Sequence, residues 1–162
     1  MQITFQSIGT IHSPFQEVAG MPIQPAGARG VQGSITIEPE FQAGLKDIEG
    51  MSHLILLYHL HQEAGYALEV KPFLDNQSHG IFATRAPHRP NAIGLSVVRL
   101  QKVEGNTLWI EDVDILDGTP LLDLKPYVPQ FDTPVGDVQI GWFTHNVQRV
   151  DRTRSDQRFR NK

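Results

Sequence analysis

Short apolar runs separated by turn residues alternate along the whole chain. The runs are rich in Ile, Val, Leu, Thr and aromatic residues, and Gly and Pro are scattered between them, which is typical of strands joined by turns. Long segments with helical periodicity are missing. The pattern predicts strands near residues 3–12, 31–38, 51–61, 66–71, 79–84, 94–103, 107–115, 120–126 and 138–143, with one short helix over 41–50. We therefore predict an all-β fold.

Two segments define the sheet more closely. Between two β-rich runs, the triplet Glu104-Gly105-Asn106 supplies residues that tolerate positive φ, so we expect a hairpin there. In residues 51–62 (MSHLILLYHLHQ) both alternating sets of side chains are largely apolar, which favours a central strand covered on two sides. A closed or nearly closed barrel explains such a strand best. Residues 13–30, rich in Pro and Gly, are predicted to form a long ordered loop.

The composition narrows the chemistry. With 162 residues, 40% of them hydrophobic, the chain can bury one core, so we predict one domain, residues 1–144, and a basic tail, residues 145–162. Cysteine is absent, which excludes a disulfide framework, a thiolate zinc site and a cysteine nucleophile. The first segment carries 8 basic and 16 acidic side chains and the tail carries 6 and 2, so a uniformly basic nucleic-acid binder is excluded. The tail either contacts RNA phosphates or is a solvated end.

Several signals of other protein classes are absent. The opening residues MQITFQSIGTIHS lack a basic region followed by an apolar one, and no stretch approaches the roughly 20 apolar residues that cross a bilayer. We expect a soluble, cytoplasmic protein with no membrane partner. The sequence also lacks the glycine fingerprint of dinucleotide-binding folds, the P-loop, the serine hydrolase pentapeptide and the HExxH zinc motif.

Residues 83–96 (ATRAPHRPNAIGLS) concentrate positive charge in a stiff segment. Arg85, His88 and Arg89 lie around two prolines, each of which holds the preceding residue in extended geometry. Rigidly held guanidinium groups suit bidentate recognition of a carboxylate or a phosphate, so we predict an anionic ligand. The alternative is that both arginines are ordinary surface residues and the prolines only end strands.

Residues 114–127 (DILDGTPLLDLKPY) contain an Asp-Gly pair at positions 117 and 118. By itself, Asp-Gly predicts only a hairpin turn. Here Asp117 lies near Asp114 and Asp123 in the sequence, and Thr119 can donate a hydrogen bond. The loop can therefore also hold a ribose diol or an adenine edge.

Three histidines, His53, His59 and His61, are predicted to share one face of the strand over 51–61. Positions 59 and 61 have a spacing that can place two imidazoles on one metal ion, but no third ligand occurs at a typical spacing. We therefore predict no metal site. The remaining interpretations are histidines satisfied by hydrogen bonds in the barrel and a ligand contact by His61 together with Gln62.

Five segments together resemble the TrmO/TsaA-like family of methyltransferases: IGTIHSPF (8–15), QPAGARG (24–30), GMSHLILLYHLHQ (50–62), GIFATRAPHRPNAIGLS (80–96) and DILDGTPLLDLKPY (114–127). Five motifs in the same order are far more specific than any one of them. The resemblance implies a single-sheeted antiparallel β-barrel with long loops, which binds S-adenosylmethionine without a Rossmann fold, and a homodimer. This agrees with the all-β prediction and with the missing glycine fingerprint.

The resemblance also implies roles for individual residues. The cofactor pocket is expected to involve Gln24, Pro25, Ala26, Gly27, His61, Gln62, Arg85, Leu95, Asp117, Gly118, Thr119 and Pro120. The substrate is expected to contact Arg89, Asn91, Lys125 and Tyr127. The expected catalytic residues are Arg89, His88 and Asp117, with His88 or Asp117 as the proton acceptor.

Characterised members of this family methylate N6 of N6-threonylcarbamoyladenosine (t6A) at tRNA position 37, giving m6t6A. The resemblance implies that activity here, with the tRNA anticodon loop as partner and Arg89 or Arg85 reading the threonyl carboxylate. Alternatives are a non-enzymatic RNA-binding β-barrel and a methyltransferase of the same fold acting on another small substrate. Ala92 stands where the family pattern has a proline, and the extra C-terminal segment of longer bacterial members is not in this sequence, which leaves the mode of tRNA docking open.

Overall fold

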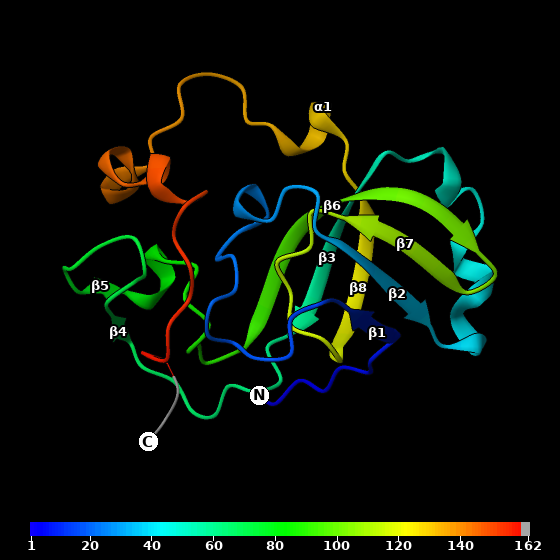
Figure 1. Ribbon diagram of the computed structural model, residues 1–162, viewed down its shortest axis with the longest axis horizontal. Helices are drawn as coiled ribbons and strands as arrows, with labels where there is room; N and C mark the ends of the chain where they lie inside the picture. Colours follow the sequence, from blue (N-terminus) through cyan, green and yellow to red (C-terminus); the bar gives the residue numbers. More distant parts are fainter. Residues whose placement is uncertain (160–162) are drawn as a thin grey trace.

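Six strands close into one antiparallel β-barrel in the computed structural model, which describes residues 1–159 (Figure 1). Around the barrel the strands follow the order β1-β2-β7-β6-β3-β8. Their bounds are β1 Gly9–His12, β2 Gln32–Ile37, β3 His53–His59, β6 Ile93–Glu104, β7 Thr107–Glu111 and β8 Thr119–Pro126. The predicted all-β antiparallel barrel is confirmed.

The remaining elements are short and belong to the connections and to the C-terminal segment. A two-stranded sheet, β4 Glu69–Val70 and β5 His79–Gly80, stands beside the barrel (Figure 1). There is a one-turn helix, α1 Pro129–Asp132. The 3-10 helices are η1 Pro25–Gly27, η2 Pro39–Leu45, η3 Ile48–Gly50, η4 Ile81–Ala83, η5 Gly141–His145 and η6 Val147–Arg149. Within residues 1–159, none of these helices has the length and apolar character needed to cross a membrane.

The barrel interior holds the main hydrophobic core. In β3, Leu54, Leu56 and Tyr58 point inward and are buried, while the intervening Ile55 and Leu57 are half-buried. The other strands and the β7–β8 connection complete this core with Ile11, Ile35, Ile37, Val98, Leu108, Ile110, Val113, Ile115 and Leu121. Because β3 pairs with β6 on one side and with β8 on the other, the prediction of a central strand is confirmed.

Two predicted turns have the expected backbone. The triplet at 104–106 joins β6 to β7 as a hairpin, and Gly105 has a φ of 63°. Gly118 has a φ of 74° and immediately precedes β8. Both positions require the left-handed region that glycine adopts without steric cost.

Several predicted boundaries differ from the structure. The strand predicted over 3–12 starts only at Gly9, where pairing with β2 and β8 begins. The strand predicted over 138–143 is wrong, because Gly141 has a φ of 54° and opens a 3-10 helix. The helix predicted over 41–50 is two 3-10 helices, since Asp47 between them has a φ of 68°. The segments 66–71 and 79–84 keep only the two-residue strands β4 and β5.

The described part of the predicted basic tail packs against the rest of the chain. Ser155 pairs with the long loop before β2: the Gly20 N–H donates to the Ser155 carbonyl over 2.8 Å, and the Ser155 N–H donates to the Met21 carbonyl over 2.9 Å. Phe159 packs on a second, small hydrophobic cluster next to β4 and β5. The last three residues of the predicted tail lie outside the described residues.

Candidate cofactor-binding site

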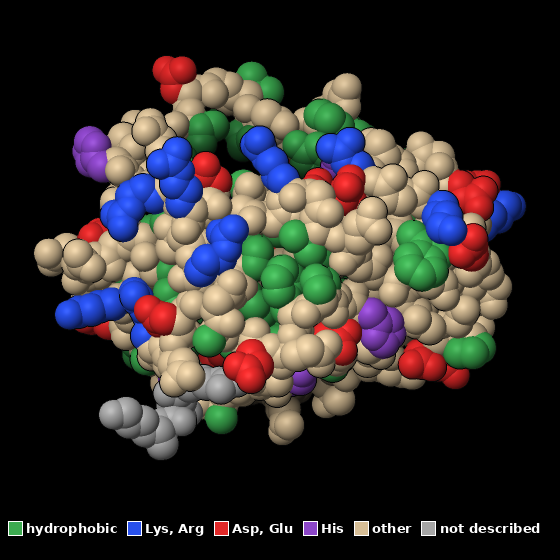
Figure 2. Space-filling view, viewed as in Figure 1, with side chains coloured by type: hydrophobic (Ala, Val, Ile, Leu, Met, Phe, Trp, Pro, Cys, Tyr) green, Lys and Arg blue, Asp and Glu red, His purple; other side chains and the backbone are tan. Residues whose placement is uncertain are grey.

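A cavity of about 1010 Å³ opens at one end of the barrel, where β3 ends and where β6 and β8 begin. Four segments complete its wall: residues 18–26, residues 72–74, residues 83–89, and residues 139–150 together with Ser155. Residues 139–150, which we call the arch, lie at the end of the orange coil that passes over the top of the molecule after α1 in Figure 1, and the space-filling view shows a hollow beneath this coil (Figure 2). Segments that are distant in the sequence thus line the same cavity.

Most of the predicted cofactor-binding residues line this cavity. Its wall includes Gln24, Ala26, His61, Gln62, Arg85, Leu95 and Thr119, and also the predicted substrate residue Arg89. Pro25, Gly27 and Pro120 are direct neighbours of wall residues in the sequence but are not in the wall themselves. Four of the five sequence motifs therefore contribute side chains to one cavity.

Arg85 connects two of the wall segments. Its Nη1 donates to Oε1 of Gln24 over 2.7 Å, which ties the 83–89 segment to the loop before β2. The side chain of Arg85 is otherwise exposed. Its remaining N–H groups are thus placed to bind an anionic ligand at the cavity edge.

Arg89 stabilises the turn that carries Arg85. Its Nη1 donates to three backbone carbonyls, those of Ile81 at 3.2 Å, Thr84 at 3.0 Å and Ala86 at 3.3 Å. Its guanidinium carbon also lies 6.0 Å from the centre of the Phe82 ring. One nitrogen of Arg89 therefore holds the backbone of this turn. The sequence analysis predicted only a contact between Arg89 and the substrate.

His61 and Thr119 meet on the cavity wall. The Thr119 hydroxyl donates to the Leu116 carbonyl over 2.7 Å, and Nδ1 of His61 lies 3.4 Å from the same hydroxyl oxygen. Because that hydroxyl has only one proton, it accepts from the Nδ1–H of His61. Burial lowers the pKa of His61, and the neighbouring His59 lowers it further. At neutral pH the imidazole is uncharged.

Tyr58 and Asp114 form the polar floor of the cavity, and the buried Ser96 connects them from behind. Oγ of Ser96 donates to Oδ1 of Asp114 over 2.6 Å and lies 3.0 Å from the hydroxyl of Tyr58. Burial raises the pKa of Asp114 to about 6. Burial also raises the pKa of Tyr58, and the charge of Asp114 adds to this effect. Tyr58 and Ser96 were missed as site residues. Gly94 lets the Tyr58 ring pack against the β6 backbone, since a Cβ at Gly94 would lie 2.1 Å from that ring.

Comparisons with known proteins identify the family of this chain. A family model described as the tRNA-methyltransferase O N-terminal domain matches residues 10–133. The chain belongs to the TrmO family. It is 53% identical, over 98% of its length and 86% of the relative, to a probable S-adenosyl-L-methionine-binding protein of Pyrococcus abyssi. It is 34% identical to the human tRNA (adenine(37)-N6)-methyltransferase over 80% of this chain and 31% of the relative.

Solved structures of TrmO have the same fold. The crystal structure of TrmO from Pseudomonas aeruginosa matches with a TM-score of 0.73 and 40% identity, covering 88% of this chain and 63% of that one. The chain thus spans most of the Pyrococcus relative, under two thirds of the Pseudomonas structure and about a third of the human enzyme. The recognised family is confirmed.

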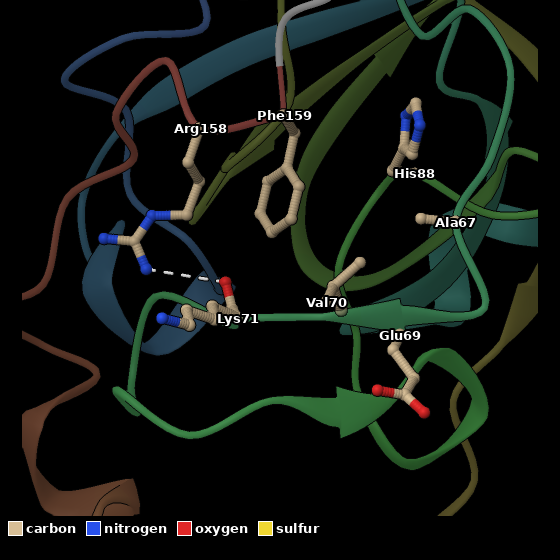
Figure 3. Close-up of a pocket in the computed structure, with 7 residues that line it drawn as sticks. All are labelled: Ala67, Glu69, Val70, Lys71, His88, Arg158 and Phe159. Atoms are coloured by element: carbon tan, nitrogen blue, oxygen red, sulfur yellow. Dashed lines mark hydrogen bonds between the residues drawn. The ribbon is translucent and has the colours of Figure 1, made fainter.

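The catalytic candidates His88 and Asp117 of this TrmO-family chain lie outside the cavity wall. His88 lines a smaller pocket of about 410 Å³ together with Phe159 and Arg158 (Figure 3), and its Nδ1 lies 3.4 Å from Oε2 of Glu63. Asp117 accepts a hydrogen bond from the Ser13 N–H over 3.0 Å, and this bond is the main cause of its lowered pKa. Neither side chain lines the cavity, and the predicted roles of both residues in proton transfer stay predictions.

Other predicted residues are also remote from the cavity. Lys125 and Tyr127 lie at the opposite end of the barrel, where Lys125 pairs with Asp123 over 2.7 Å and the Tyr127 N–H donates to the His53 carbonyl over 3.0 Å. Asn91 is exposed. Gly118 is exposed and precedes β8. Their predicted contacts with substrate or cofactor stay predictions.

The arch above the cavity was not recognised from the sequence. Its Trp142 donates from Nε1 to the Ala83 carbonyl over 2.8 Å and stacks on His79, with ring centres 4.4 Å apart. Trp142 and Phe143 both line the cavity. Within residues 1–159 the structure contains no cluster of three His, Asp or Glu side chains arranged for a metal ion.

Proposed function

We propose that this chain binds S-adenosylmethionine in the large cavity and methylates N6 of t6A at position 37 of tRNA. The observation that carries the proposal is the convergence of four separate TrmO motifs on one cavity, through Gln24, His61, Arg85, Leu95 and Thr119. Relatives named as S-adenosyl-L-methionine-binding proteins and as a tRNA (adenine(37)-N6)-methyltransferase support the cofactor and the substrate class.

The residues of the cavity fit a ligand that carries both charges and an aromatic base. Arg85 offers a guanidinium edge for a carboxylate, and Asp114 offers a carboxylate to a cation. Leu60, Ile115 and Leu116 supply apolar wall against which an adenine can pack. When bound, the cofactor supplies an electrophilic methyl group attached to a positively charged sulfur.

The chain must orient the acceptor nitrogen and take up its proton. N6 of t6A is a urea-like nitrogen and a weak nucleophile, so its proton must leave as the new N–CH₃ bond forms and the S–CH₃ bond breaks. We propose His61 as the acceptor, because its Nδ1–H is held by Thr119 and its lowered pKa keeps the ring neutral. The arch with Trp142 limits access of water.

Binding and transfer can be tested on the purified chain without added metal. We expect calorimetry to show one site per chain for S-adenosylmethionine and for S-adenosylhomocysteine. Labelled methyl groups should then appear in tRNA that carries t6A and not in the same tRNA transcribed without modification, and mass spectrometry of the nucleosides should identify m6t6A. Folded protein that binds neither compound would rule out the proposed function.

The threonyl carboxylate of t6A distinguishes this substrate from plain adenosine, and we propose that Arg89 recognises it. Nη1 of Arg89 holds backbone carbonyls, which leaves Nε and Nη2 for an anion. Arg89→Lys keeps a charge and three donors for the carbonyls but removes the planar edge. We expect cofactor affinity close to wild type and roughly a tenfold fall in kcat/KM on tRNA.

Arg89→Met and a control variant separate the two roles of Arg89, which are binding the substrate carboxylate and holding the backbone of the 81–86 turn. Arg89→Met removes every donor, so cofactor binding should also weaken, because the 81–86 turn loses its three bonds. Arg99→Lys is the matched control, since Arg99 is an exposed residue that faces Glu111 over 3.6 Å. If Arg89→Lys kept the wild-type kcat/KM on tRNA, Arg89 would serve only to hold the backbone carbonyls. Arg85 would then be the residue that binds the threonyl carboxylate.

We also propose that two chains associate as a homodimer. At the cavity edge on β6, Ile93 and Leu95 are 38% and 48% exposed, which leaves apolar wall residues open to solvent. A second copy of the chain would cover them and narrow the cavity. Sedimentation velocity should give twice the mass of one chain, and Leu95→Lys should shift it towards one chain.

A further inference from the structure

Asp114 is a buried carboxylate with no positive partner in contact. It lies deep among protein atoms at the cavity floor, yet part of its surface is accessible from the cavity. Oδ1 accepts the short hydrogen bond from Ser96. Among the described residues, no Lys, Arg or His nitrogen lies within 4.0 Å of it, the distance of an ion pair. A negative charge at such a position is costly unless something compensates it.

The hydrogen-bond network fixes the direction in which Asp114 can act. The Ser96 hydroxyl has one proton and uses it in the hydrogen bond to Asp114. The hydroxyl of Tyr58 must therefore donate its own proton to Ser96. Tyr58 comes from β3, Ser96 from β6 and Asp114 from the β7–β8 connection, and all three side chains are therefore held from the barrel wall. Such a chain stabilises the ionised carboxylate, and the more distant charge of Arg85 stabilises it further, but no cation contacts it.

We propose that Asp114 makes the cavity select a cationic sulfonium ligand over the neutral thioether that remains after methyl transfer. The proposal rests on the proposed function, since it concerns the charge that the sulfur carries. At effective dielectric constants of about 20, a unit charge several ångströms from a buried carboxylate gains enough energy to change affinity by roughly tenfold or more. The attraction disappears once the methyl group has left, which favours release of the product.

The experiment compares three ligands by calorimetry, in the absence of tRNA. S-adenosylmethionine and sinefungin carry a positive charge at or next to the sulfur position, and S-adenosylhomocysteine does not. All three share the adenosine and amino acid ends, so the ratio of their dissociation constants isolates that one charge. For the wild-type chain we expect both cationic ligands to bind roughly tenfold more tightly than S-adenosylhomocysteine.

Asp114→Asn tests the carboxylate while keeping an oxygen acceptor for Ser96. We expect the preference for the cationic ligands to disappear, so that the ratio of the dissociation constants is about one. S-adenosylhomocysteine should bind as tightly as before or more tightly. Asp123→Asn is the matched control, because Asp123 pairs with Lys125 in the half of β8 away from the cavity, and should keep the wild-type ratio. Equal weakening of all ligands by Asp114→Asn would overturn the proposal and leave Asp114 a structural residue.

A pH series on the wild-type chain gives a test that needs no variant. Burial raises the pKa of Asp114 to about 6, so the preference for cationic ligands should decline as pH falls from 8 to 5. Tyr58 and Arg85 interact with Asp114, and His61 and Glu63 are the titratable groups elsewhere in the cavity wall whose charge can change in this range, since burial lowers the pKa of His61 and raises that of Glu63. The decline that persists in Asp114→Asn measures the part due to His61 and Glu63. A flat ratio would overturn the proposal, whereas failure of all ligands to bind wild type would overturn the proposed function as well.

Discussion

Replacement of His61 by Gln is expected to lower kcat for tRNA methylation by roughly 100-fold or more, which is the range of general base catalysis. Gln keeps a polar group that can reach Thr119 but cannot accept a proton. The dissociation constant for S-adenosylhomocysteine should change by only a few-fold. Turnover at saturating tRNA and calorimetry on the same preparation measure the two effects.

The pH dependence of kcat is a second test of His61 as the proton acceptor. Only the neutral imidazole accepts a proton, so kcat should rise with pH through the pKa of His61, which burial places below the ordinary histidine value. His59 is exposed and its charge also lowers that pKa. His59→Gln is therefore the control: it should keep the turnover at high pH and move the acid limb to slightly higher pH. Wild-type turnover by His61→Gln would exclude His61 as the proton acceptor.

The barrel itself could be predicted because its strands are locally encoded. β3 carries inward apolar residues at every second position, and the β6–β7 turn contains Gly105 at the position that needs positive φ. The strand predicted over 138–143 failed for a non-local reason. Its apolar residues face the cavity from the arch, where Trp142 bonds to Ala83, and a cavity wall shows the same composition as a strand.

The candidate site was predicted as a set of motifs, and the structure shows what motifs cannot specify. The sequence indicates that Arg85 and Arg89 are stiffly held, but only the fold shows that Arg89 uses one nitrogen for three backbone carbonyls. His88 and Asp117 were plausible bases by residue type. Their contacts with Glu63 and Ser13 depend on the fold, and in the structure neither side chain lines the cavity.

Truncation after Thr144 is expected to weaken binding of S-adenosylhomocysteine by roughly 100-fold and to lower Tm. The basic tail suggested a segment that contacts RNA phosphates without affecting the cofactor, but its described part closes the cavity wall. Val147, Val150 and Ser155 line that wall, and the Ser155 hydroxyl donates to the Val18 carbonyl. The same hydroxyl accepts from the Met21 N–H over 2.9 Å, so with its two backbone bonds Ser155 makes four hydrogen bonds to this loop. At about 0.5–1 kcal/mol each, their loss is enough for that factor.

The matched control for this truncation is a chain that ends after Phe159, which keeps every described contact of the tail. That chain should bind S-adenosylhomocysteine as tightly as the full chain does. Any loss of its affinity for tRNA is then due to the missing charges of Arg160 and Lys162. The longer truncation removes both the wall and four more arginines, and it should weaken tRNA binding further and flatten its salt dependence. Because loss of the wall exposes the 18–22 loop, cofactor affinity and Tm should fall together. Unchanged cofactor affinity after truncation at Thr144, with only the salt slope altered, would mean that the tail acts on RNA alone and that the arch is dispensable for the cavity.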